Sequence, residues 1–434
     1  MELLNLLKEL VSFDTTIGVK KKPSKDCPKF IRDYLEDRGV SCEILEEKGY
    51  YTVHGEIGRG RPIVALLSHF DTVPFNQEEW KSHPLELRID GNRAYGRGSL
   101  DDKSNVASIM TALESMEPKK GRVVFAFTGD EEIGGKMGAL KWADYLKEEG
   151  LWPDYLINGD GYGMFPIIRR RGVFGVRITV PSDKRKVKGL EVEFDFSLRC
   201  PISKTGHAAQ FLPGVDEHPL IALSQEVRLR GILLSNIDGN FVKSNVLPSR
   251  VKARGVIPKG DSGEEIEVNL GLTELVKSIV PLTRIPLKPE KYSDFGINIT
   301  PNVLEVKEKS IELLLDVRIM SRELSKEEFE EVLRSNLREY SLRISGRSGY
   351  LYTPENSKLV LECLKVLRDL GEESSPGEGA GASDSRYFSP EVEAIDIGPR
   401  GGGAHSSEEY VEIDSLEKMP TLYSRLVKSL LGGG

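Results

Sequence analysis

Three short apolar runs constrain the fold of this chain more than any other feature. They are Ile63–Leu67, Val123–Phe127 and Tyr155–Ile157, each with the length of a buried strand rather than of a buried helix. Apolar residues with helical spacing lie between them, at 106–116 and around 136–149. Because strands that alternate with helices form parallel sheets, we predict an α/β fold with a mixed, largely parallel sheet flanked by helices.

The pattern changes at about Gly172 and returns after Tyr350. Longer alternating strands such as Ile311–Arg318 replace the apolar runs, and a helical stretch occurs at Pro219–Arg230. This texture predicts an α+β domain inserted between two parts of a first domain. The predicted segments are 1–171, 172–350 and 351–434.

Composition excludes several classes of partner. The chain has 434 residues, 60 of them basic and 68 acidic, and no basic stripe that would indicate a nucleic-acid partner. No run approaches the roughly 18 apolar residues of a membrane span. Met1–Lys8 has the form of an amphipathic helix start, not of a signal peptide. Four scattered cysteines without a CxxC pair favour a reducing cytoplasm.

A histidine ends the first apolar run, in the segment Ser68–Pro74. Asp71 follows His69 by two residues, and in extended chain such residues face the same way. Asp71 can therefore contact one imidazole nitrogen of His69 and leave the other nitrogen for a metal ion. These residues alone leave open a plain histidine–aspartate pair at a strand end.

Four further segments end a strand or a glycine turn with a residue of metal-ligand type. They carry Asp101, the pair Glu131–Glu132, Asp160 and His405. Sites in open α/β sheets form at the carboxyl ends of the strands, so we expect these residues to converge with His69. Two histidines and three carboxylates suit a pair of zinc-like ions, because three carboxylates and a bridging hydroxide balance the ions' charge.

The adjacent glutamates suggest a division of roles. Neighbours in extended chain point apart, so one glutamate can bind metal while the other acts as general base. Each candidate has a plainer explanation when taken alone. These explanations are a helix N-cap for Asp101, a solvated acidic turn for Glu131 and Glu132, a turn for Asp160 and an exposed loop for His405.

Six motifs together resemble one enzyme family. The motifs are SHFDTVP, GRGSLDDK, TGDEEIGG, NGDG, GASDSRYF and GGGAHSSEEYV, and they span almost the whole chain. They resemble the di-zinc amidohydrolase and exopeptidase family that contains acetylornithine deacetylase, succinyl-diaminopimelate desuccinylase, aminoacylase-1, glutamate carboxypeptidase and several dipeptidases. We therefore expect a metal-dependent amide hydrolase.

The resemblance implies two divalent ions, with zinc expected and cobalt or manganese also suited to the ligands. The implied ligands are His69 and Asp160 for one ion, Glu132 and His405 for the other, and Asp101 as the bridge. Asp71 would orient His69, and Glu131 would be the general base. The family also implies a cis peptide bond between Asp101 and Asp102.

The inserted domain of this family acts as a lid and a homodimerisation surface. The resemblance implies that His207 stabilises the oxyanion across the dimer, although a surface histidine fits the same residues. It also implies that Arg318 binds the substrate carboxylate. Asn245 resembles the family's Asn-x-x-Pro asparagine, but it lies farther from Arg318 than usual, and Asn302 is a nearer candidate.

Two features favour different substrates. The segment 381–386, with Ser383 as a substrate contact, resembles the deacetylase and desuccinylase branch. An aspartate at position 160 instead is more typical of aminopeptidases and dipeptidases. We expect hydrolysis of a small N-acyl amino acid, with a dipeptidase, aminopeptidase or carboxypeptidase as the alternative. An inactive binding protein is a further alternative. Such a protein would lack a metal ligand or the general base, and this sequence has all of them.

Overall fold

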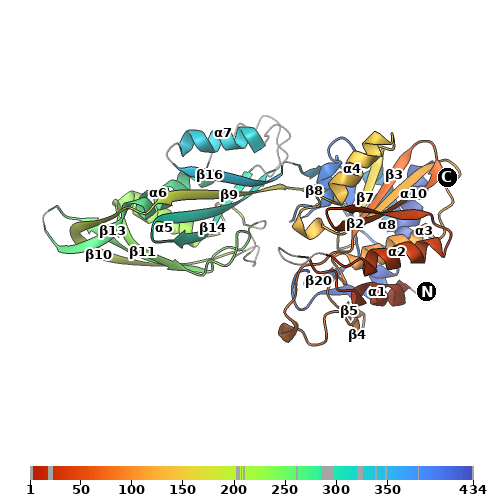
Figure 1. Ribbon diagram of the computed structural model, residues 1–434, viewed down its shortest axis with the longest axis horizontal. Helices are drawn as coiled ribbons and strands as arrows, with labels where there is room; N and C mark the ends of the chain where they lie inside the picture. The colour runs from red at the N-terminus through yellow and green to blue at the C-terminus, as the bar shows by residue number, and fades with distance from the viewer. Residues whose placement is uncertain are drawn as a thin grey trace. The chain divides into compact units, whose positions relative to one another are not determined.

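The computed structural model describes residues 3–17, 23–201, 206, 208, 211–260, 262–284, 297–319, 326–337, 340–347, 349–379 and 381–432. The chain divides into two compact units. The first unit consists of Met1–Arg170 and Gly349–Gly434, and the second unit of Arg171–Ser348. Figure 1 labels their helices and strands.

The first unit is built around a sheet that has nine strands within the described residues. These are β1 (Cys42–Glu47), β2 (Tyr50–Arg59), β3 (Ile63–His69), β6 (Gly121–Thr128), β7 (Tyr155–Asn158), β8 (Ile167–Arg170), β17 (Leu351–Tyr352), β18 (Gly377–Glu378) and β19 (Glu393–Asp396). The order is β1-β2-β6-β3-β7-β19-β8-β17, with β18 paired to β8. The neighbours β6, β3, β7 and β19 run parallel, while β1, β2, β8 and β17 add antiparallel pairs at both sides. The predicted α/β fold with a mixed sheet is therefore confirmed.

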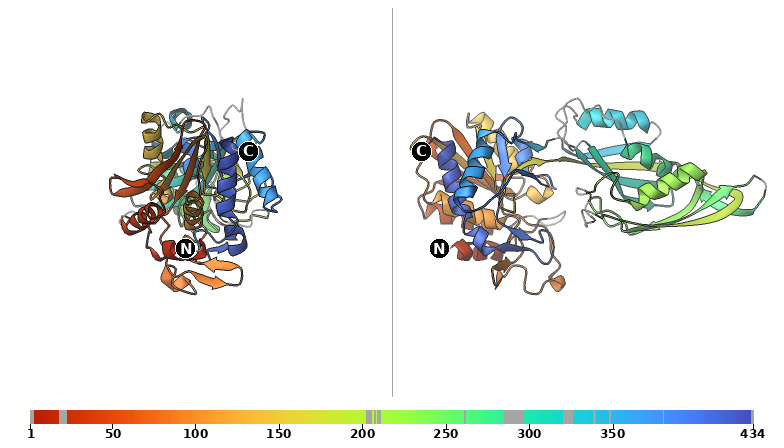
Figure 2. Two further views of the ribbon diagram at one scale, coloured as in Figure 1. Left: turned by 90° about the vertical axis from the view of Figure 1, so that its right-hand side faces the viewer. Right: turned by 180° about the vertical axis from the view of Figure 1, so that it is seen from behind.

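Helices cover both faces of this sheet (Figure 2). They are α1 (Leu3–Ser12), α2 (Asp26–Glu36), α3 (Lys103–Leu113), α4 (Ala139–Glu148), α8 (Lys358–Asp369), α9 (Ile413–Leu416) and α10 (Met419–Leu430). All seven residues of β3 are buried, and they alternate between two cores. Val64 and Leu66 join the core with α1, α2, α3, α8 and α10, whereas Ala65 and Leu67 join the core with α4. Burial on both faces explains the unbroken apolar run in the sequence.

A small second sheet of the first unit carries the loop with His405. Its order is β20-β21-β5-β4. The strands are β4 (Arg88–Asp90), β5 (Arg93–Tyr95), β20 (Gly401–Gly402) and β21 (Tyr410–Glu412). Because β21 pairs with β5, the histidine loop between β20 and β21 is tied to the chain that leads into Asp101.

The second unit contains two four-stranded antiparallel sheets within the described residues, in the orders β11-β12-β10-β13 and β14-β15-β9-β16. The strands are β9 (Gly172–Pro181), β10 (Lys184–Ser197), β11 (Leu233–Gly239), β12 (Arg250–Pro258), β13 (Glu264–Asn269), β14 (Ile297–Val306), β15 (Ser310–Ile319) and β16 (Ser341–Arg347). The helices are α5 (Pro219–Arg230), α6 (Leu270–Thr283) and α7 (Lys326–Asn336). Residues of both sheets and of all three helices share one apolar core.

Two elements are not evident from the sequence pattern. The segment after α2 is a hairpin of β1 and β2, because Lys48 and Gly49 both have positive φ, as a two-residue hairpin turn requires. The sequence did not predict α6, whose apolar residues are too dense for a clear amphipathic pattern. Among the described residues, no helix combines the length and apolar content needed to cross a membrane.

Candidate active site

His69 ends β3 and lies buried at the carboxyl end of the parallel strands. Its Nδ1 atom lies 3.1 Å from the backbone oxygen of Asp71 and 3.4 Å from the carboxylate oxygen Oδ1 of the same residue. Two acceptors at Nδ1 favour a proton on that nitrogen, so a neutral ring would offer the lone pair of Nε2 to a metal ion. The expected contact between Asp71 and one ring nitrogen is present, and the other nitrogen faces Asp101.

Asp101 lies between the two histidines. Its Oδ1 atom is 3.0 Å from Nε2 of His69, and its Oδ2 atom is 3.0 Å from Nε2 of His405. The peptide bond between Asp101 and Asp102 is cis, as the family resemblance implied. A carboxylate whose oxygens face two separate nitrogen ligands has the geometry of a bridge between two cations.

The turn between β6 and α4 presents the two adjacent glutamates. Glu131–Ile133 form a short 3-10 helix, η2. The Asp71 carboxylate accepts a hydrogen bond from the backbone amide of Glu131 at 3.1 Å and one from that of Glu132 at 3.0 Å. Asp71 therefore fixes this turn as well as the ring of His69, a second contact that the sequence did not indicate.

His405 and Asp160 complete the cluster from two other loops. His405 has a φ of 64°, in the left-handed region, and its Nε2 atom lies 3.1 Å from Oε1 of Glu132. Asp160 follows β7. The ligand atoms of five residues form two groups, each with all atoms within 4.8 Å of one another. The groups are His69, Asp101 and Asp160, and Asp101, Glu132 and His405.

The cluster holds more negative charge than its own cations balance. Burial, followed by the charges of Asp160 and Asp384, raises the pKa of Glu131 well above its ordinary value. Burial also acts to raise the pKa of Asp101, but hydrogen bonds from the two histidines outweigh it and lower that pKa. Hydrogen bonds with Asp101 and then Glu132 raise the pKa of His405 to about 11. These pKa shifts are typical of a site with excess negative charge, which bound metal cations would neutralise.

The donor set therefore fits two divalent ions. Imidazole nitrogens and carboxylate oxygens are ligands of zinc and of the neighbouring transition metals. Two ligand groups that share one carboxylate provide two adjacent positions rather than one.

A buried glutamate anchors the loop of Asp101. The Glu409 side chain is fully buried, and its carboxylate accepts hydrogen bonds from four donors. The donors are the backbone amides of Gly98 (3.1 Å), Leu100 (3.0 Å) and Asp101 (3.0 Å) and the Arg97 guanidinium (2.5 Å). Because Glu409 follows His405 by four residues, it connects the histidine loop to the bridging aspartate. Glu409 was not among the predicted site residues, although its place in the last motif was a signal.

Asp102 holds the strand end of His69. Its Oδ2 atom accepts from the Ser68 hydroxyl at 2.5 Å and from the backbone amide of His69 at 3.3 Å. Its Oδ1 atom accepts from the Asn105 amide at 2.7 Å, and Asn105 also donates to the backbone oxygen of Gly159, one residue before Asp160. The second aspartate of the Asp101–Asp102 pair thus supports the site, a role that its sequence position alone does not indicate.

Arg170 supports Asp160. Its guanidinium donates to the backbone oxygen of Asp160, and Nη2 lies 3.4 Å from Oδ1 of the same residue. The guanidinium also forms an ion pair with buried Asp396. Only the folded sheet brings β8 beside β19, so no local pattern indicates this arginine.

Ser383 lies just before a segment that contacts the turn of the two glutamates. It precedes the short 3-10 helix η4 (Asp384–Tyr387), is buried, and its hydroxyl has no hydrogen-bond partner among the described residues. The hydroxyl of Tyr387 and Nη2 of Arg386 both donate to the backbone oxygen of Gly134, at 2.5 and 3.0 Å. These bonds join η4 to the end of η2.

The remaining candidates belong to the second unit, and His207 lies outside the described residues. Arg318, on β15, is buried and makes a bidentate pair with Asp316, at 2.7 and 3.0 Å. Asn302 is buried and donates to the backbone oxygen of Ser244 at 2.5 Å, so the segments of the two asparagine candidates adjoin. The backbone oxygen of Asn245 accepts from the amide of Ala208.

Comparisons with known proteins find a family model and relatives that cover most of the chain. A model of the family described as Peptidase family M20/M25/M40 matches residues 65–429. The chain is 25% identical over 428 residues to a succinyl-diaminopimelate desuccinylase of Stenotrophomonas maltophilia (strain R551-3), with 93% of this chain and 94% of the relative covered.

Solved structures share the fold. The aminoacylhistidine dipeptidase from Vibrio alginolyticus matches with a TM-score of 0.71 at 16% identity, over 98% of this chain and 96% of that one. The YXEP protein of Bacillus subtilis, described as a dinuclear metal-binding peptidase, matches with a TM-score of 0.53 at 13% identity, over 99% and 97% of the two chains.

Proposed function

The chain belongs to peptidase family M20/M25/M40, and we propose that this metal-dependent amide hydrolase cleaves the acyl group from a small N-acyl amino acid. One observation carries the proposal: Asp101 turns one oxygen to each of two histidines and is shared by both ligand groups. The desuccinylase relative, which covers the chain almost end to end, supports an acyl substrate.

The proposal assigns two metal ions to the five clustered side chains. His69 and Asp160 hold one ion, Glu132 and His405 hold the other, and Asp101 bridges them. Zinc is the proposed ion, with cobalt or manganese as substitutes. When bound, the ions lower the pKa of a water molecule and polarise the scissile carbonyl.

The chain's own residues move the proton and orient the ligands. Glu131 takes the proton of the attacking water and passes it to the leaving amine. Asp71 positions both the proposed base and a proposed metal ligand. Its carboxylate accepts a hydrogen bond from the backbone amide of Glu131 and faces Nδ1 of His69. Ser383 is the proposed contact of this unit with the substrate.

We also propose that the second unit is a lid and a homodimerisation surface, with His207, Arg318 and Asn245 or Asn302 as substrate contacts, in a cytoplasmic enzyme. The family resemblance supports these roles. Size-exclusion chromatography with light scattering tests the dimer: a mass of about 97 kDa is expected for two chains of 48.3 kDa each. A monomer at micromolar concentration contradicts it.

A dipeptidase is the second candidate. Two observations favour it: position 160 is an aspartate, and the dipeptidase from Vibrio alginolyticus shares the fold along nearly the whole chain.

A substrate panel separates the two candidates. The purified chain is assayed with zinc, cobalt or manganese against N-acetyl, N-succinyl and N-carbamoyl amino acids and against dipeptides with a free amine. The proposal expects the largest kcat/KM for an N-acyl amino acid. Activity confined to free-amine dipeptides would replace the deacylase with a dipeptidase, and no hydrolysis of either class in metal-loaded protein would reject both.

A further inference from the structure

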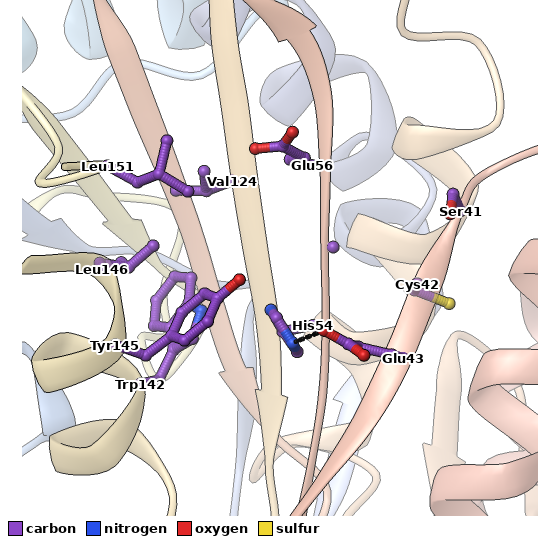
Figure 3. Close-up of a pocket in the computed structure, with 11 residues that line it drawn as sticks. Ser41, Cys42, Glu43, His54, Glu56, Val124, Trp142, Tyr145, Leu146 and Leu151 are labelled. Carbon is purple, nitrogen blue, oxygen red and sulfur yellow. Dashed lines mark hydrogen bonds and ion pairs between the residues drawn. The ribbon is translucent and has the colours of Figure 1, made fainter. Parts of the chain in front are cut away.

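A cavity of about 300 Å³ lies in the first unit between α4 and the face of β1 and β2 (Figure 3). Its volume is at the lower end of the range for small-molecule sites. None of the metal-type ligands lines it. The helix side supplies Trp142, Tyr145 and Leu146, and the strand side supplies Glu43, His54 and Glu56.

Strand register explains why polar groups gather on this face. Glu43 pairs with His54 across β1 and β2, and Glu56 pairs with Val124 across β2 and β6. Paired residues point to the same side of a sheet. The alternation along β2 adds Glu56 to the face that already carries His54. Two carboxylates and one imidazole therefore lie on the face of the sheet that α4 covers.

The imidazole is an acceptor in this pocket. Nε2 of His54 lies 3.0 Å from Oε1 of Glu43. Burial lowers the pKa of His54, although Glu43 opposes the shift, so the ring is neutral at pH 7. A neutral ring that donates from Nε2 to a carboxylate keeps a lone pair on Nδ1.

The carboxylates keep free acceptor capacity. Glu56 accepts from Arg122 at 2.8 Å through Oε2, and Glu43 binds His54 through Oε1. Each therefore has a second oxygen to offer. Among the described residues that line the cavity, none is a lysine or an arginine. The two carboxylates outnumber the one guanidinium that contacts them, that of Arg122, so the charge around the cavity is negative and attracts a cation.

The cavity is also lined by a buried hydrogen-bond donor, the indole N–H of Trp142. Trp142 is 1% exposed, and its indole Nε1–H has no hydrogen-bond partner in the described part of the chain. Figure 3 shows the indole beside the phenol of Tyr145, with its nitrogen edge toward the strands. The phenol meets the His54 ring edge to face at 4.9 Å. Buried N–H groups of this kind are almost always satisfied, by protein, water or ligand.

We propose that this pocket binds a small primary ammonium compound that carries a hydrogen-bond acceptor next to the charged nitrogen. The ammonium hydrogens bind the free oxygen of Glu56 and Nδ1 of His54. Glu43 holds the proton on Nε2, at the other side of the ring, and adds negative charge. The acceptor binds the indole N–H of Trp142, and the aromatic faces of Trp142 and Tyr145 favour the cation. Amino amides and free amino acids both have this chemistry.

Isothermal titration calorimetry of the full-length, metal-loaded chain tests the proposal. The probes are glycinamide and glycine, with acetamide as the neutral control and acetate as the anionic control. We expect heat from glycinamide and none from the two controls. Binding of glycine with equal affinity identifies amino acids as ligands, and weaker binding of glycine identifies amino amides. If neither glycinamide nor glycine gives a heat of binding at concentrations up to about 10 mM, the proposal is wrong.

Variants locate the binding. Glu43→Gln with Glu56→Gln removes both charges, and we expect the Kd for glycinamide to rise at least tenfold. Trp142→Phe keeps an aromatic ring without the N–H, and we expect a severalfold rise. Glu148→Gln is the matched control, because Glu148 is an exposed residue of α4 that does not line the cavity. If the double variant binds glycinamide as tightly as the original chain, the amine is bound elsewhere and the proposal fails. Hydrolytic activity and thermal midpoint confirm that each variant folds.

Discussion

One buried polar cluster of the first unit and one buried ion pair of the second unit are balanced in opposite ways. In the first unit, the carboxylates of Asp101, Glu131 and Asp160 crowd around two histidines, and burial raises the pKa of Glu131 and Asp160. In the second unit, Arg318 has its own aspartate in a bidentate pair. The carboxylates around the two histidines carry excess negative charge that only added cations can balance. The pair of Arg318 and Asp316 is neutral without any added ion. Variants of the first should change chemistry and metal affinity, and variants of the second should change stability.

The largest expected effect belongs to the proposed general base. Glu131→Gln removes the proton acceptor but keeps the size of the side chain. We expect turnover to fall by about 10²–10⁴-fold, with two metal ions per chain retained. Steady-state kinetics and metal analysis after dialysis measure the two quantities. A near-native rate would show that another group takes the proton, and loss of metal would make Glu131 a ligand.

A buried ion pair should dominate the stability of the second unit. Arg318→Met leaves Asp316 charged and unpaired, and we expect the free energy of unfolding to fall by about 3–5 kcal/mol. The double variant with Asp316→Asn should recover most of that loss. Chemical denaturation measures both values. A stable single variant would contradict the self-balanced pair.

The same double variant sharpens the proposed role of Arg318 in binding. If Arg318 contacts the substrate carboxylate, the KM for an N-acyl amino acid should stay raised even where the double variant restores stability. A native KM in that variant would make Arg318 structural only.

The stability of the second unit should depend on pH through His218. His218 caps α5 by accepting from the amide of Leu220, and burial lowers its pKa to about 4. The unfolded chain, with an ordinary pKa near 6.5, binds the proton more readily. The stabilisation is therefore complete above pH 6.5 and is lost as the pH falls from 6.5 toward 4, by about 3 kcal/mol in all.

Unfolding measured at pH 7 and pH 5 tests the effect of His218. His218→Asn keeps a side chain that can cap a helix but does not titrate in this window. We expect the variant to lose less stability than the original chain on acidification. Equal losses would assign the acid sensitivity to other groups.

The smallest expected effect concerns the anchor of the Asp101 loop. Glu409→Gln keeps one acceptor oxygen but removes the charge that Arg97 and three backbone amides face. Changes in such supports typically cost 10–100-fold in metal affinity. We expect a loss in this range, measured by competition with a chelator. Glu408→Gln is the control, because Glu408 is an exposed neighbour that pairs with Lys81 at the surface. Unchanged affinity in Glu409→Gln would remove its role in positioning Asp101.

Part of the fold and of the site could be predicted because local pattern carries it. The apolar run before His69 gave β3, since a strand buried on both faces needs apolar residues throughout. The hairpin of β1 and β2 and the dense helix α6 were missed, because turn geometry and tertiary burial override a weak periodicity. For the site, residue type and position at strand ends indicated Asp101, Asp160 and His405 as candidates.

The sequence by itself determined the types and the order of the candidate ligands, because metal chemistry limits them to few side chains and parallel strands present them at one edge. Only the tertiary structure decided which buried charges support them. Glu409, Asp102 and Arg170 act through partners on distant strands and loops. A buried charge is stable only beside its partner, and that partner is set by packing rather than by local sequence.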